Sequence, residues 1–129
     1  MPAHPRLSDD HRSCVIQALQ SLRPAVIYLF GSFGTCSQHA DSDIDIALLP
    51  AMATEPITCF HLANLLADQL GRPVDLVDLN EASTVLAKEV LRTGIPIDIA
   101  NPQLQQQFEM RTLADYARLN EERQPILAS

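Results

Sequence analysis

The stretch LFGSFGTCSQHADSDIDIALL, residues 29–49, decides the fold of this chain. One apolar run stops at Gly31-Ser32, and a second apolar run begins with Asp43-Ile44-Asp45. Apolar runs bounded by a connection that contains glycine and serine predict two β-strands joined by a turn. In an extended strand, residues i and i+2 point to the same face. The two aspartates are therefore expected to lie side by side, while Ile44 and Ile46 point into a core.

A pair of neighbouring carboxylates has a chemical consequence. The two negative charges repel each other and raise one pKa. Hard divalent cations such as Mg²⁺ remove this penalty, because they prefer carboxylate oxygens. Gly31-Ser32 suits a strand-to-helix turn, with a short helix from Ser32 whose backbone N–H groups face a phosphate. A phosphate cradle beside a carboxylate metal site predicts phosphoryl or nucleotidyl transfer.

This spacing resembles a known signature. Gly31-Ser32, ten intervening residues and Asp43-Ile44-Asp45 resemble the motif of the DNA polymerase β-like nucleotidyltransferase superfamily. The short chain is similar to the minimal nucleotidyltransferase (MNT) group, many members of which are antitoxins paired with HEPN-domain ribonuclease toxins. The resemblance covers nearly the whole chain and implies the nucleotidyltransferase fold.

Composition limits the classes of partner. The 129 residues suit a single minimal nucleotidyltransferase domain over residues 1–129, with loose tails at about 1–7 and 124–129. The formal charge of −7, from 16 acidic and 9 basic residues, disfavours direct nucleic-acid binding and favours a partner protein with a basic surface. The three cysteines form neither a disulfide framework nor a zinc pattern. With no apolar signal core and no membrane span, we expect a cytoplasmic protein without membrane contact.

The order of elements predicts the fold class. Ser8 caps a first helix that stops before Pro24, and strands are expected at residues 25–30 and 43–49. The later signals predict a helix from Pro56 to Gly71, a strand at 73–79, a helix from 80–83 to 91, an edge strand with a proline at 95–99, and a final helix from Asn101-Pro102. This order indicates an α/β (α+β) fold with a mixed β-sheet of three to four strands flanked by helices.

Helical periodicity also predicts which side chains are buried. The predicted core positions are Phe60, Ala63, Leu66 and Leu70 in one helix, and Leu104, Phe108, Tyr116 and Leu119 in the last.

A third acid is expected on the strand at 73–79. Its alternation places Val74, Leu76 and Asp78 on one face and Asp75, Val77 and Leu79 on the other. Asp75 matches the third acid of the family that the chain resembles. Asp78 is interpreted instead as a cap of the following helix.

The resemblance then implies the site. Asp43, Asp45 and Asp75 would be both catalytic residues and ligands of two Mg²⁺ ions, and Gly31 and Ser32 would bind the phosphates of the substrate ATP. Members of the family often have Ala-Arg where this chain has Gly34-Thr35. The missing arginine leaves Thr35, Arg23 or a partner residue to compensate.

Three functions remain open at this point. The resemblance implies an antitoxin of a HEPN/MNT system, a protein adenylyltransferase that transfers AMP from ATP to a tyrosine of the cognate HEPN ribonuclease toxin and neutralises it. A small-molecule, aminoglycoside-type nucleotidyltransferase is a second hypothesis, but those relatives usually carry an added helical domain. A non-catalytic antitoxin with the same fold, which binds its toxin without modifying it, is the third.

Overall fold

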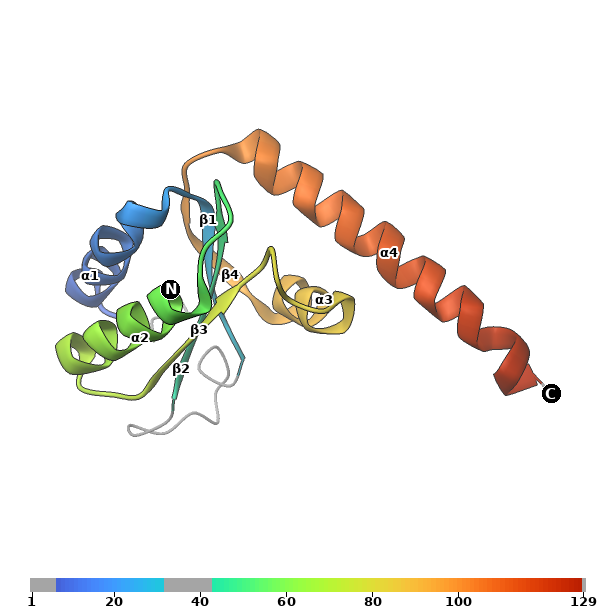
Figure 1. Cartoon of the computed structure of the whole chain (residues 1–129), viewed down its shortest axis with the longest axis horizontal. Helices are drawn as coiled ribbons and strands as arrows, with labels where there is room; N and C mark the ends of the chain where they lie inside the picture. Colours follow the sequence, from blue (N-terminus) through green and yellow to red (C-terminus); the bar gives the residue numbers. More distant parts are fainter. Residues whose placement is uncertain (1–6, 32–42, 129) are drawn as a thin grey trace.

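The part of the chain that the structure describes contains four strands and four α-helices (Figure 1). The computed structural model describes residues 7–31 and 43–128. The elements are α1 (Asp9–Leu19), the 3-10 turn η1 (Gln20–Leu22), β1 (Pro24–Phe30), β2 (Ile44–Pro50), α2 (Pro56–Leu70), β3 (Val74–Asp78), α3 (Thr84–Thr93), β4 (Ile95–Ile99) and α4 (Pro102–Ala128). The order predicted from the sequence is confirmed for these residues. The short helix expected from Ser32 lies outside the described residues.

The strands form one mixed sheet in the order β3-β2-β1-β4. Strand β1 pairs antiparallel with both β2 and β4, and β2 pairs parallel with β3. The central strand β1 is buried along its whole length, as its unbroken apolar sequence requires. Strand β4 lies at the edge, which is where a strand that contains Pro96 is tolerated.

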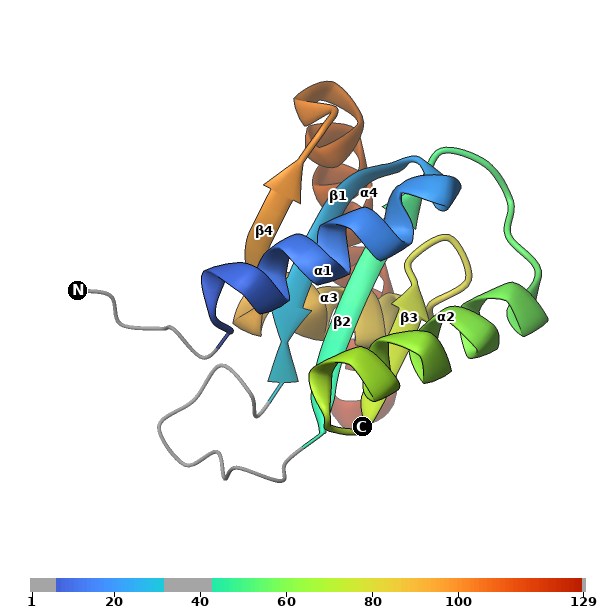
Figure 2. The same ribbon diagram turned by 90° about the vertical axis from the view of Figure 1, so that its left-hand side faces the viewer.

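Helices cover both faces of the sheet (Figure 2). On one face, Val15 and Leu19 of α1 and Leu66 and Leu70 of α2 pack against Ile44, Ile46 and Leu48 of β2 and against Ile27 and Leu29 of β1. On the other face, Ala87 and Val90 of α3 and Phe108 of α4 pack against Tyr28, Phe30, Ala47 and Leu49. The alternation of side chains along β1 and β2 therefore supplies two hydrophobic cores.

Local capping chemistry sets the helix ends. Ser8 accepts a hydrogen bond from the His11 N–H, Ser83 from the Leu86 N–H and Asn101 from the Leu104 N–H, each at 3.1 Å. Pro56 occupies the first turn of α2, and Gly71 ends this helix with a φ of 72°, a conformation that glycine adopts without strain. The described helices include none long and apolar enough to cross a bilayer.

The burial predicted for α2 is wrong at Phe60, which is 59% exposed. The helix packs on the sheet through Leu62, Leu66 and Leu70, one residue per turn. Phe60 lies about 120° around the helix from Leu66. Its ring therefore faces the outer side of β3, where the sheet ends.

Helix α4 also differs from the prediction. Of its side chains up to Glu121, Phe108 and Thr112 are buried, whereas Leu104 is 39% exposed and Tyr116 and Leu119 are half-buried. The helix runs away from the sheet toward the C-terminus, so its apolar positions do not all meet the core (Figure 1). A tail from Gln124 was expected, but the helix continues to Ala128.

The buried Tyr28 of β1 is hydrogen-bonded to helix α4. The Tyr28 hydroxyl donates a hydrogen bond of 2.7 Å to Oε2 of Glu109. Gln105 Nε2 donates to the same carboxylate oxygen at 3.3 Å. Burial, and then the hydrogen bond to Glu109, raises the pKa of Tyr28. The phenol therefore stays protonated and remains a donor throughout the physiological pH range.

Removing this hydroxyl tests the attachment of α4. Tyr28→Phe leaves the half-buried Glu109 carboxylate without its short hydrogen bond, and we expect the free energy of unfolding to fall by about 1–2 kcal/mol. Urea denaturation measures the change. Tyr116→Phe is the control, because the described residues offer its hydroxyl no hydrogen bond. Equal losses in the two variants would contradict the attachment.

Candidate active site

The register between β2 and β3 brings two carboxylates together. Asp45 pairs with Asp75 in the parallel ladder, flanked by Ile44 beside Val74 and Ile46 beside Leu76. Residues directly paired in a sheet point to the same face. Ile44, Ile46, Val74 and Leu76 all join the core under α1 and α2. Asp45 and Asp75 therefore share the opposite face, and the facing predicted for this strand is confirmed.

The negative charge of Asp43 also acts on the carboxylate of Asp45. Burial raises the pKa of Asp45, and the negative charges of Asp75 and then Asp43 raise it further. Asp43 lies immediately before β2 and is exposed, as is Asp75. Three mutually repelling carboxylates at the end of two paired strands form an electronegative site.

The donor chemistry of these side chains fits a hard divalent cation, since carboxylate oxygens are its preferred ligands. The repulsion acting on Asp45 is the kind of energy that a bound cation relieves. Within residues 7–31 and 43–128, however, no three His, Cys, Asp or Glu side chains already form a group spaced to hold an ion. Sharing one ion would require the described carboxylates to lie closer together than they do here.

Gly31 packs directly against this site. It follows Phe30, which pairs with Asp45 across the β1–β2 ladder. Gly31 has a φ of 76°, and a Cβ atom there would collide with Oδ2 of Asp45 and lie 3.2 Å from its Cγ. Both the backbone conformation and the close approach require glycine. Ser32 and Gly34-Thr35, the other residues singled out in this loop, lie outside the described residues.

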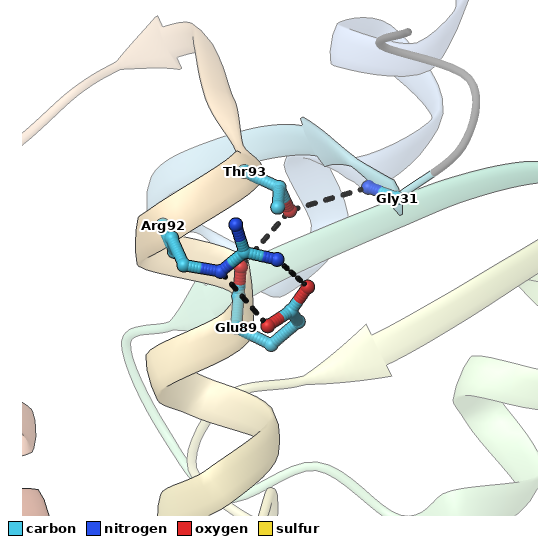
Figure 3. Close-up of polar contacts among 4 residues, drawn as sticks. All are labelled: Gly31, Glu89, Arg92 and Thr93. Carbon is cyan, nitrogen blue, oxygen red and sulfur yellow. Dashed lines mark hydrogen bonds and ion pairs between the residues drawn. The ribbon is translucent and has the colours of Figure 1, made fainter. Parts of the chain in front are cut away.

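A hydrogen bond connects Gly31 to Thr93, the last residue of helix α3 (Figure 3). The Gly31 N–H donates to Oγ1 of Thr93 at 3.5 Å, and Thr93 Oγ1 donates to the Glu89 carbonyl oxygen at 2.9 Å. Among the described residues, this long hydrogen bond is the contact that another acceptor for the Gly31 N–H would have to displace. Sequence reasoning missed Thr93, because nothing local marks a threonine at a helix end as a partner of a residue 62 positions away.

An exposed ion pair lies in the same last turn of α3 (Figure 3). Nη2 of Arg92 is 2.6 Å from Oε2 of Glu89, and Nε donates to Oε1 at 3.2 Å. The hydrogen bond to Arg92 lowers the pKa of Glu89. The sequence did not mark Arg92 as a cation near Gly31, since a charged residue in a last helical turn usually needs no such explanation.

Two other expectations about charged residues are wrong. Arg23 was a candidate to replace the missing arginine, but it precedes β1 whereas Gly31 follows this strand. Seven extended residues separate the two positions by about 23 Å. Asp78 does not cap α3: its Oδ1 accepts a hydrogen bond from the Asn80 N–H at 2.9 Å, and Ser83 is the cap.

Adjacent carboxylates on paired strands, with a glycine turn packed against one of them, define a nucleotidyltransferase-type site. The family model described as Polymerase beta, Nucleotidyltransferase matches residues 14–103. The chain belongs to this family of nucleotidyltransferases.

Relatives narrow the assignment to the minimal group. The chain is 43% identical over 102 residues to Protein adenylyltransferase MntA of Shewanella oneidensis, an alignment that covers 79% of this chain and 73% of the relative. The chain therefore belongs to the minimal nucleotidyltransferase antitoxin family that includes MntA, which confirms the resemblance found from the signature.

Solved structures of toxin–antitoxin complexes contain chains similar to this one. A chain in the crystal structure of a toxin–antitoxin with AMP-PNP superposes with a TM-score of 0.81 and 39% identity, covering 91% of this chain and 95% of that one. A chain in the structure of the tri-AMPylated Shewanella oneidensis HEPN toxin in complex with MNT antitoxin gives a TM-score of 0.77 and 37% identity, covering 92% and 93%. These similarities extend well beyond the residues matched by the family model.

Proposed function

We propose that this chain is a protein adenylyltransferase antitoxin, which transfers AMP from ATP to a tyrosine of a cognate HEPN-domain ribonuclease toxin and so neutralises it. The observation that carries the proposal is the pairing of Asp45 with Asp75 beside Gly31. The similarity to MntA, to a complex with AMP-PNP and to a complex with an AMPylated toxin supports the substrate and the partner. The net charge of −7 supports a basic protein partner over direct contact with nucleic acid.

Within this proposal, Asp43, Asp45 and Asp75 hold two Mg²⁺ ions. Mg²⁺ at this position would neutralise charge on the triphosphate and lower the pKa of the acceptor hydroxyl. Gly31 and Ser32 bind the β- and γ-phosphates, and Thr35 or a partner residue takes the place of the arginine that relatives often have. The need for ATP and Mg²⁺ together supports a cytoplasmic reaction.

The transfer itself is a displacement at the α-phosphorus. The tyrosine oxygen forms a bond to the α-phosphorus while the bond between the α-phosphorus and the bridging oxygen to the β-phosphate breaks, and pyrophosphate leaves with the electron pair. Asp75 accepts the phenolic proton. Asp75 is exposed at the outer strand of the sheet, which leaves it accessible to a macromolecular acceptor. The protein contributes positioning and charge compensation, the two main sources of catalysis in reactions of this class.

Radioactive ATP labelled at the α-phosphate tests the proposal. Incubation with Mg²⁺ and a cognate HEPN-domain toxin should label that toxin and reduce its ribonuclease activity. Asp43→Asn should abolish the label, because it removes one carboxylate of the site and leaves β2 itself unchanged. Asp68→Asn, an exposed substitution on α2, should leave labelling intact.

Two outcomes would overturn the proposal. Label found on small molecules alone would indicate the aminoglycoside-type activity. Equal silencing of the toxin by the wild-type and Asp43→Asn proteins would indicate a non-catalytic antitoxin that acts by binding.

A further inference from the structure

Helix α3 covers the face of the sheet that carries the two paired carboxylates. Val90 of α3 belongs to one buried cluster with Ala47 of β2, and Val77 of β3 packs against this cluster. Asp45 precedes Ala47 by two residues along β2 and therefore shares its face. Asp75 stands in the same relation to Val77 along β3. Both carboxylates thus lie on the α3 side of the sheet, at the end where β2 and β3 begin.

The C-terminal end of α3 reaches this carboxylate site. Thr93, the last residue of the helix, accepts the hydrogen bond from the Gly31 N–H, and Gly31 lies directly against the side chain of Asp45. The carbonyl groups at a helix C-terminus carry partial negative charge, which adds to the charge of the carboxylates. A triphosphate that binds beside Gly31 therefore needs a cation close to the last turn of α3.

Arg92 provides a cation in this last turn. Its side chain is 61% exposed and extends from the helix toward the side on which Gly31 lies (Figure 3). Its ion-pair partner Glu89 has a side chain that is 48% exposed. Water and salt screen such an exposed pair, so it contributes little to stability. The guanidinium can therefore leave Glu89 for a stronger acceptor without a large cost.

A triphosphate is the stronger partner for this guanidinium. It carries several negative charges where a carboxylate carries one, and the planar fork of arginine donates two parallel hydrogen bonds to either group. Arg92 already presents this fork: Nε donates to Oε1 of Glu89 at 3.2 Å and Nη2 donates to Oε2 at 2.6 Å. The pair with Glu89 thus holds the guanidinium in the arrangement that a phosphate group accepts.

We propose that Arg92 is a nucleotide-binding residue, which exchanges its ion pair with Glu89 for the triphosphate of ATP. Glu89 keeps the guanidinium beside the site until the nucleotide binds. This inference rests on the proposed function and names a residue that recognises the substrate of that same site. The other contacts proposed for the triphosphate remain, and Arg92 adds a cation that this chain itself supplies.

Binding of AMP-PNP with Mg²⁺, measured by calorimetry without toxin, tests the role of Arg92. Arg92→Gln should raise the Kd by about tenfold or more, because the charge-assisted hydrogen bonds to phosphate are lost. Arg92→Lys should give an intermediate Kd, since lysine keeps the charge and lacks the fork.

Arg118→Gln is the matched control for Arg92→Gln. Arg118 forms an exposed ion pair of the same i,i+3 spacing with Asp115, at 2.8 Å on α4. This variant loses the same charge and the same kind of pair, and should bind AMP-PNP like the wild type. The melting temperatures of the two variants should agree, which separates nucleotide recognition from a structural role.

A change of opposite sign is expected at Glu89. Glu89→Gln removes the acceptor that competes with the phosphates, so the Kd for AMP-PNP should fall by about twofold or more. In the Arg92→Gln background the same substitution should have a smaller effect, because no guanidinium remains to be released. An equal fall in both backgrounds would mean that Glu89 repels the nucleotide directly, and would overturn the exchange.

The binding measurement also keeps this inference distinct from the proposed function, which concerns transfer to the toxin. If the wild type binds AMP-PNP but labels no toxin, the proposed function fails and the Kd of Arg92→Gln still decides the inference. An Arg92→Gln protein that binds AMP-PNP as tightly as Arg118→Gln would overturn the inference. A wild type that binds no AMP-PNP would overturn it as well.

Discussion

Asp45→Asn should abolish AMP transfer and, at the same time, stabilise the protein in the absence of metal. The carboxylate of Asp45 is destabilised by burial and by the charges of Asp75 and Asp43. Asparagine removes that charge and keeps nearly the same shape, so the melting temperature at neutral pH should rise. Transfer to the toxin should fall by at least about 100-fold, because the site loses one of its preorganised charges.

The pH dependence gives the sign of the stability effect. Because the pKa of Asp45 is raised in the folded state, its contribution to stability is fully present below the unfolded pKa, near 3.8, and is lost as the pH rises through the folded pKa. The melting temperature of Asp45→Asn should therefore exceed that of the wild type at pH 7, and the difference should shrink as the pH falls toward 4.

Added Mg²⁺ separates this effect from general stabilisation. It should raise the melting temperature of the wild type more than that of Asp45→Asn, and should affect the control Asp68→Asn as it affects the wild type. A variant that is less stable than the wild type at pH 7, or that retains full transfer, would contradict the role of Asp45.

Gly31→Ala is expected to cost both stability and activity, whereas Gly71→Ala should cost stability alone. The two glycines have nearly the same φ, 76° and 72°. A Cβ at Gly71 meets no atom within 4 Å, but a Cβ at Gly31 collides with the Asp45 carboxylate. Gly71→Ala should therefore lower the free energy of unfolding by about 1–2 kcal/mol through backbone strain alone. Gly31→Ala should lower it further and displace Asp45 from Asp75.

Chemical denaturation and transfer kinetics test this pair together. Subtracting the loss in Gly71→Ala from the loss in Gly31→Ala isolates the cost of the contact with Asp45. Transfer should fall by at least about tenfold in Gly31→Ala and stay near the wild-type rate in Gly71→Ala. Similar losses of stability in the two variants, with full transfer in both, would mean that Gly31 does not position Asp45.

The sequence by itself determined the elements whose causes act over a few residues. Ser8, Ser83 and Asn101 cap helices because their side chains reach a backbone N–H three residues ahead. Gly71 ends α2 because its φ of 72° strains other residues. The alternation of β3 also fixed which face carries Asp75, since the side-chain period of a strand does not depend on its neighbours.

Only the tertiary structure decided which of these elements meet. Helical periodicity marked Phe60 as apolar, but its burial depends on where the sheet ends, and the sheet ends at β3. The pairing of Asp45 with Asp75 depends on the parallel register of β2 and β3, and the contact of Thr93 with Gly31 on the packing of α3. The shared core sets which elements pack together, and the packing of whole elements sets the long-range partners of each residue. No short stretch of sequence therefore encodes these contacts.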